Sequence, residues 1–210
     1  MSDRVSKILV IVAVWISFES CGALAPRADP SSYYILGALP EADMAADKNA
    51  AGIKANFSVG LGPIELPAYL DRQQIVTRTS TNRLSYSEND RWAAPLSESF
   101  SRVLEQDMSH LLNPARVIQF PWQSTDAPDY QVKIEVLQFE ANSNQEALLT
   151  AHWTVIDRNK KLLVDRRSQL HRRAGSLSTE DFVKALSQTV RELSREIVET
   201  LLTFDKQGKI

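Results

Sequence analysis

Residue types that would mark a chemical function are scarce in this chain of 210 residues. It has one cysteine, Cys21, and therefore cannot form an intramolecular disulfide. Its three histidines, His110, His152 and His171, lie far apart and lack the spacing of a zinc site. Basic and acidic residues nearly balance, 24 against 26, unlike the basic composition of many nucleic-acid-binding domains. We expect a globular domain with no metal, no cofactor and no nucleic-acid partner.

Sequence signatures of catalysis are missing as well. The fragment GLGPIE has only two glycines of a phosphate-binding loop, and a proline stands where that loop would start a helix. There is no G-x-S-x-G motif. Glu88 and Asp90 are close in sequence, but two acids in a polar turn before a helix are usually solvated. We therefore predict no catalytic residues, although a Ser-His-Asp triad has no fixed spacing and a hydrolase remains a third, weaker hypothesis.

The chain also lacks an apolar run long enough to span a bilayer. Its longest, residues 8–18, has eleven residues, against the roughly 20 that a transmembrane helix needs. Arg4 and Lys7 precede this run, and small or turn-forming residues follow it. This layout is typical of a bacterial secretory signal, so residues 1–20 are predicted to be a signal peptide.

Cys21 directly follows that signal, and it could be a buried thiol, half of a disulfide or an acylation site. The intramolecular disulfide is excluded by the lack of a second cysteine. The segment resembles a bacterial lipoprotein signal, which implies cleavage before Cys21 and lipid attachment to it. A plain signal peptide or an incidental cysteine is the alternative. Because Gly22 follows instead of aspartate, the resemblance implies the periplasmic face of the outer membrane of a Gram-negative bacterium.

The rest of the chain is predicted to be a tether and one domain. Residues 21–32 contain two prolines and no apolar periodicity, which indicates an extended lipidated tether. Its last eleven residues reach about 35–40 Å when fully extended. Residues 33–210 are enough for a single domain with its own core. Residues 40–52 are predicted to be a loop or a poor helix.

Apolar periodicity predicts a layered α/β or α+β domain with a sheet of about five strands and two long helices. Segments with strand character lie at residues 33–36, 57–64, 73–78, 83–88, 116–120, 130–140, 146–157 and 160–170. Leucine and other apolar residues recur every three or four positions at 96–112, which predicts an amphipathic helix. A second helix is predicted to begin at the capping box of Ser178 and Asp181.

Two segments are candidate binding surfaces. Residues 64–76 place Tyr69 and Leu70 in a proline-punctuated stretch, where they are either covered by the domain's own helix or kept for a partner. Seven cations also lie within sixteen residues: Arg158, Lys160, Lys161, Arg166, Arg167, Arg172 and Arg173. They form either a solvated hairpin or a basic patch for anionic lipid head groups or an acidic partner face.

Two stretches, VGLGPIELPAYLDRQQIVTR and NRLSYSENDRWAAPL, carry a family resemblance. They resemble the ABC-type transport auxiliary lipoprotein family, which includes the PqiC-like lipoproteins. The matching residues are Gly62, Pro63, Leu66, Pro67, Tyr69, Leu70, Asp71, Arg72, Ile75, Val76, Asp90, Arg91, Trp92, Ala93, Pro95 and Leu96. The resemblance implies a three-layer domain with a mixed sheet, similar to the amino-terminal domain of TolB.

The same resemblance implies a non-catalytic lipoprotein of a lipid or solute transport system in the cell envelope. Such a lipoprotein would dock a periplasm-spanning protein of the mammalian-cell-entry (MCE) family at the outer membrane, and a homo-oligomeric ring would match a ring-shaped partner. The alternative is a periplasmic lipoprotein that binds a lipid or small apolar ligand by itself.

The motif residues Asp71, Arg72, Asp90, Arg91 and Trp92 allow two interpretations. In the first, an arginine and a carboxylate among them pair and lock the loop against the start of the helix. In the second, they form the surface that meets the partner.

Overall fold

The computed structural model describes residues 29–38, 55–112, 116–123, 125 and 127–206 of the chain. The chain divides into two units, Met1–Pro30 and Ser31–Ile210. Only Asp29 and Pro30 of the first unit are described, so the predicted signal peptide, Cys21 and the predicted loop at residues 40–52 lie outside the described residues. The fold below belongs to the second unit. In the described ranges, no helix is long and apolar enough to cross a bilayer.

Within the described ranges, eight strands form one mixed sheet. They are β1 (Ser32–Tyr34), β2 (Ser58–Glu65), β3 (Gln74–Ser80), β4 (Arg83–Trp92), β5 (Arg116–Gln119), β6 (Tyr130–Asn142), β7 (Glu146–Asp157) and β8 (Leu162–Arg173). The mixed sheet is confirmed, but the predicted number of about five strands was wrong. The short strands β1 and β5 find parallel partners in β4 and β2, so segments of three and four residues also join the sheet.

The long strand β6 organises this sheet. One of its edges pairs antiparallel with β7, and β7 pairs in turn with β8. Its other edge accepts two strands in succession, β2 near its start and β3 near its end, both parallel to it. Because β2 and β3 follow one another along a single edge, the chain between them must leave the sheet and rejoin it. This excursion, residues 66–73, is the motif loop, and it contains the 3-10 helix η2 (Ala68–Leu70).

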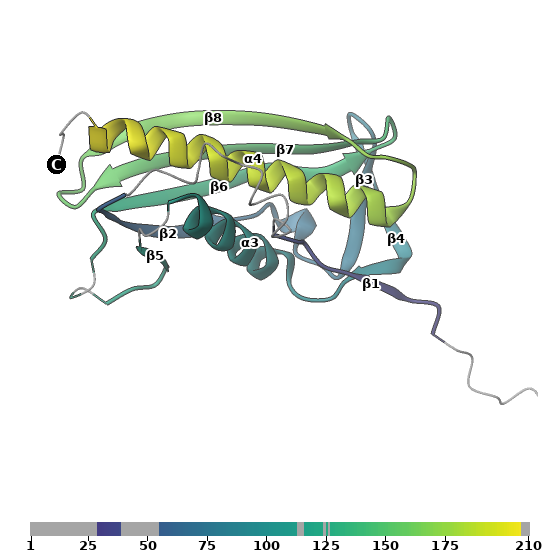
Figure 1. Ribbon diagram of the computed structural model, residues 1–210. Helices are drawn as coiled ribbons and strands as arrows, with labels where there is room; N and C mark the ends of the chain where they lie inside the picture. The colour runs from purple at the N-terminus through teal and green to yellow at the C-terminus, as the bar shows by residue number, and fades with distance from the viewer. Residues whose placement is uncertain (1–28, 39–54, 113–115, 124, 126, 207–210) are drawn as a thin grey trace, which may run out of the picture. The chain divides into compact units, whose positions relative to one another are not determined.

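Both long helices cover one face of the sheet (Figure 1). Helix α3 (Leu96–Leu111) and helix α4 (Thr179–Lys206) each bury one apolar stripe. The innermost members of these stripes have no exposed surface: Phe100, Val103, Leu104, Met108, Val190, Leu193, Ile197 and Leu201. Half of the predicted capping box is formed: the Ser178 hydroxyl accepts a hydrogen bond from the Asp181 backbone N–H at 3.1 Å, whereas the Ser178 N–H donates to the Ser176 hydroxyl instead of the Asp181 side chain.

The opposite face of the sheet carries no helix among the described residues. Successive residues of a strand point to opposite faces, and in β6 the alternate positions Lys133, Glu135 and Leu137 are exposed. In β7, Trp153 and Val155 are fully buried beneath the helices. The described residues therefore form two layers, not the three that we predicted, because both apolar helix stripes are used on the same side. We call the other side the outer face.

Candidate partner-binding surface

The strand β2, which leads into the motif loop, departs from regular pairing at Gly62. Gly62 has a φ of +119°, a conformation that is readily available only to glycine. The register of β2 against β6 shifts just after it. The side-chain amide of Gln131 in β6 donates a hydrogen bond to the Gly62 carbonyl oxygen at 2.8 Å. The family glycine thus marks an irregularity within β2, and the strand stays paired with β6 up to Glu65, where the motif loop follows.

A buried carboxylate holds the motif loop. The Tyr69 hydroxyl donates a hydrogen bond to Oε2 of Glu140 in β6 at 2.7 Å, and Nε of Arg78 in β3 donates to Oε1 at 2.5 Å. The side-chain amide of Gln138 (3.0 Å) and the backbone N–H of Phe139 (3.1 Å) also donate to this carboxylate. The Glu140 side chain has no exposed surface and that of Arg78 is 25% exposed. Loop, β3 and β6 are therefore joined at one charged group.

The protonation of this cluster follows from its burial and its charges. Burial raises the pKa of Tyr69 well above its ordinary value, and the hydrogen bond and negative charge of Glu140 raise it further. Burial by itself lowers the pKa of Arg78, but the hydrogen bond and charge of Glu140 outweigh this effect and raise it. At neutral pH the tyrosine therefore keeps its proton and the arginine its charge.

The rest of the motif loop divides between core and solvent. Leu70 is 2% exposed and belongs to the core. Arg72 Nε donates to the carbonyl oxygen of Tyr69 at 3.0 Å, and its guanidinium lies 4.2 Å from the ring centre of Tyr86. Asp71 is exposed. The loop thus presents Asp71 and Arg72 to solvent, with Arg72 stacked on the exposed Tyr86 ring of β4, whereas Tyr69 and Leu70 fix the loop to the domain.

The second motif segment lies at the end of β4, and two of its residues have internal contacts. Trp92 is 6% exposed, and its backbone N–H donates to the carbonyl oxygen of Gln73 at 2.7 Å. Oδ2 of Asp90 accepts hydrogen bonds from the Thr179 hydroxyl at 2.7 Å and the Ser87 hydroxyl at 3.1 Å. Since Thr179 is the first residue of α4, Asp90 joins the end of β4 to the start of the helix.

The predicted pairing of charges inside the motif was wrong. In the part of the chain that the structure describes, neither Arg72 nor Arg91 forms an ion pair with Asp71 or Asp90. Asp90 is already satisfied by hydroxyl groups, and Nε of Arg91 is buried without a hydrogen-bond partner among the described residues. The carboxylate that holds the loop is Glu140. A role of these residues in binding a partner stays a prediction.

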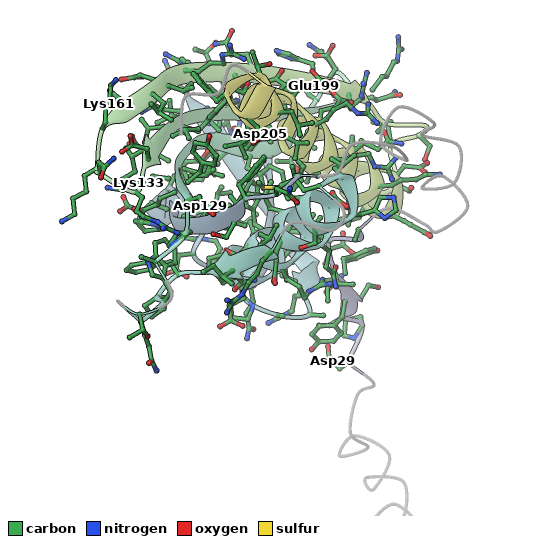
Figure 2. The ribbon with its side chains drawn as sticks, turned by 60° about the vertical axis from the view of Figure 1, so that its left-hand side comes forward. Asp29, Asp129, Lys133, Lys161, Glu199 and Asp205 are labelled. Carbon is green, nitrogen blue, oxygen red and sulfur yellow. The ribbon has the colours of Figure 1, made fainter. Side chains whose placement is uncertain are left out.

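The seven predicted cations are not gathered into one patch. Arg158, Lys160 and Lys161 lie at the turn between β7 and β8, at the end of the domain where Figure 2 also shows Asp129. Nη2 of Arg158 pairs with Oδ1 of Asp129 at 2.7 Å. Burial raises the pKa of Asp129, but hydrogen bonds from Ser58 and the charge of Arg158 outweigh it and lower the pKa.

The other four cations are divided between the two faces of β8. Arg172 pairs with Glu192 of α4, and the guanidinium of Arg166 lies 5.5 Å from the ring centre of Trp153 on the helix side. Arg167 and Arg173 have the opposite parity in the strand and belong to the outer face. An arginine pair that is adjacent in sequence therefore contributes one charge to each face.

Two polar clusters contain residue types that hydrolases use, but they are not in one place. Nε2 of His152 lies 2.6 Å from Oδ1 of Asp165 on the outer face. The buried Ser168 hydroxyl donates to Glu196 and accepts from Nε1 of Trp153 on the helix side. The sheet separates this histidine from this serine. In the described ranges, no three histidine, cysteine, aspartate or glutamate side chains group in a way that could hold a metal.

Sequence reasoning missed Glu140 and Arg78, the two charged residues that hold the motif loop. Tyr69 lies 71 residues before Glu140, and Arg78 lies 62 residues before it, so no local spacing reveals the contact. The one available signal is that Glu140 stands between Phe139 and Ala141, both of which are buried. An acid between two apolar residues of a strand is a weak signal, since alternation places it on the solvated face.

Comparisons with known proteins agree on the fold. Residues 38–198 match the family model described as the ABC-type transport auxiliary lipoprotein component. A crystal structure of an uncharacterized protein is 20% identical, with a TM-score of 0.67 over 81% of this chain and 98% of that one. Protein XCC0632 from Xanthomonas campestris, a DUF330 protein, is 17% identical, with a TM-score of 0.69 over 85% of this chain and 99% of that one. No curated protein sequence matches the chain significantly.

Proposed function

Because the chain belongs to the family of ABC-type transport auxiliary lipoprotein components, we propose that it is a non-catalytic adaptor of a transport system in the cell envelope. In this proposal, lipid on Cys21 anchors it to the periplasmic face of the outer membrane of a Gram-negative bacterium. There the domain docks the far end of a periplasm-spanning MCE-family protein. A homo-oligomeric ring of the lipoprotein would match a ring-shaped partner.

The observation that carries this proposal is the family match over residues 38–198, together with what the family motif does in the fold. Four motif residues have side chains that make contacts inside the domain: Tyr69, Leu70, Trp92 and Asp90. The His152 and Ser168 clusters lie on opposite faces of the sheet. The internal contacts of the motif residues fix the loop that carries the exposed Asp71 and Arg72, and this arrangement suits a docking surface.

The experiment is capture of the MCE protein encoded by the same organism. The full-length lipoprotein, carrying a carboxy-terminal affinity tag, is cross-linked in intact cells, purified from membranes, and probed with an antibody against that MCE protein. We expect the MCE protein in the wild-type eluate and its loss when Asp71 and Arg72, the solvent-facing charges of the motif loop, are both replaced by alanine. Glu88→Ala together with Arg83→Ala, two exposed residues of β4, is the matched control.

The alternative, a lipoprotein that binds a lipid or small apolar ligand alone, predicts a different result. Native mass spectrometry of the purified protein would then show a monomer that retains a noncovalent lipid, and no MCE protein would be captured. Capture of the MCE protein by an oligomer without such a ligand supports the adaptor. The failure of capture in wild-type cells, with the MCE protein expressed, would contradict it.

A further inference from the structure

An apolar patch lies on β1, the strand next to the tether. Tyr33 and Ile35 point to the same side of the chain and are 62% and 51% exposed, whereas the intervening Tyr34 is half-buried and Leu36 is 1% exposed. Alternation therefore places one pair of side chains in the domain and the other pair in solvent. A tyrosine and a β-branched aliphatic residue exposed side by side form a contiguous apolar patch, and such patches on soluble proteins often serve in binding.

A third exposed apolar residue lies nearby. Leu177, 67% exposed, precedes Thr179 at the start of α4. The Thr179 hydroxyl bonds to Asp90, and Asp90 stands opposite Ser32 in the β1–β4 register. Glu180 and Asp181, three and four residues after Leu177, line the same groove as Tyr33 and Ile35, so all three exposed apolar side chains belong to the region where β1 meets the start of α4. We call Tyr33, Ile35 and Leu177 the β1 patch.

The surroundings of the β1 patch are polar and mixed in charge. A shallow groove between β1 and α4 is lined by Tyr33 and Ile35 and by the charged residues Glu180, Asp181, Lys184 and Arg191 of the helix. Two acids and two bases leave no net charge in this lining. A strongly charged partner therefore gains little here, whereas the mixed charges suit zwitterionic head groups.

The position of the β1 patch in the sequence determines how far it can lie from a lipid anchor at Cys21. Only eleven residues, 22–32, separate Tyr33 from Cys21. As a flexible chain they have a mean span of roughly 20 Å, and fully extended they reach about 40 Å. A patch tethered so closely to a bilayer meets it at a high effective concentration, so even weak apolar contact is enough to hold it there.

The size of the β1 patch also favours a membrane over a second copy of the chain. Three side chains of this kind expose roughly 300 Å² in total. A stable protein interface needs about 800 Å² from each partner. Aromatic and aliphatic side chains at a polar border are, by contrast, sufficient for shallow interfacial contact with lipid when an anchor supplies most of the affinity.

We propose that Tyr33, Ile35 and Leu177 rest on the surface of the bilayer that holds the anchor, in the head-group region, and so fix the orientation of the domain. This inference rests on the proposed lipid anchor at Cys21. It adds a contact that orients the domain, with the start of α4 towards the lipid. The turn between β7 and β8, at the other end of the long strand β8, then points away from the bilayer.

The test uses full-length protein with a single introduced cysteine, Ile35→Cys, and the matched control Leu162→Cys, whose parent residue is 54% exposed at the far end of β8. Each protein is labelled with an environment-sensitive thiol dye and reconstituted into vesicles of phosphatidylethanolamine and phosphatidylglycerol. We expect the dye at position 35 to shift to the blue and to lose emission when nitroxide-labelled lipid is included. The dye at position 162 should do neither.

The outcomes separate this inference from the anchor on which it rests. Equal emission and equal quenching of the dyes at positions 35 and 162 would overturn the membrane contact. A blue shift at position 35 that persists in detergent, without quenching by labelled lipid, would instead assign the patch to contact with a second copy of the chain. Intact mass reports the anchor independently, since an acylated Cys21 takes no dye. If Cys21 proves unmodified, the same quenching measurement is made with Cys21→Ser protein held on the vesicles by an amino-terminal histidine tag and nickel-chelating lipid, and it still decides for or against the patch.

Discussion

Replacing Arg78 by methionine should lower the free energy of unfolding by much more than the same replacement of an exposed arginine. The substitution keeps the aliphatic stem and removes the guanidinium that lies 2.5 Å from Glu140, whose side chain has no exposed surface. Breaking a buried pair in this way costs about 3–5 kcal/mol, because a charge is left uncompensated. Tyr69, Gln138 and the Phe139 N–H still donate to Glu140, so we expect about 3 kcal/mol, the lower end of that range.

The assay is urea unfolding of the purified protein at pH 7, followed by far-ultraviolet circular dichroism. The exposed Arg83 in β4 supplies the control, and Arg83→Met should change the free energy of unfolding by less than about 0.5 kcal/mol. Adding Glu140→Gln to Arg78→Met removes the stranded charge and should restore more than half of the loss. A cost below about 1 kcal/mol for Arg78→Met, or a double variant less stable than the single one, would refute the role assigned to this cluster.

Three further predictions concern other contacts. Tyr69 has a raised pKa in the folded state, so its contribution to stability should be present below about pH 10 and be lost as the pH rises through the folded pKa. Tyr69→Phe should therefore flatten the decline of the urea midpoint between pH 9 and about pH 11. An unchanged slope would argue against the buried hydroxyl. Asp129 has a lowered pKa in the folded state, so its contribution to stability should be present above about pH 4 and be lost as the pH falls through the folded pKa. Asp129→Asn should therefore make the free energy of unfolding less sensitive to acid. Glu88→Gln, at an exposed position, is the control. Gly60→Ala would put a Cβ 2.5 Å from Pro128 and 2.7 Å from Trp122, and should cost about 1–3 kcal/mol in urea unfolding, whereas Gly37→Ala, with open space around it, should cost little.

Local periodicity is sufficient to predict most elements of this fold. The alternation of Tyr130, Val132, Ile134 and Val136 marks β6 because that strand is buried on one face only. The apolar stripe at 96–112 marks α3 for the same reason, with the helical period. The number of layers could not be predicted in this way, since an apolar stripe shows that a helix is covered but does not show on which side of the sheet it lies.

The site was less accessible to sequence reasoning than the fold. The motif loop was found through its family resemblance, but its contact with Glu140 depends on β2 and β3 sharing one edge of β6, a property of topology. The distribution of the basic residues over the two faces of β8, by contrast, could have been predicted from the sequence. Arg166 and Arg167 are neighbours in a strand, and neighbours in a strand face opposite sides. When a predicted strand carries a run of basic residues, only every second one should therefore be counted toward a basic patch on one face.

The central claim is that this domain acts while anchored to a membrane through one lipidated cysteine. Several acyl chains, at about 0.8 kcal/mol per buried methylene, would hold it stably on a membrane that a protein with a single chain would leave. The direct measurement is the intact mass of the protein recovered from separated inner and outer membranes of cells that express the full-length chain. We expect a product that begins at Cys21, carries the mass of those acyl chains and sediments with the outer membrane. A soluble periplasmic product with a free thiol at position 21 would contradict it.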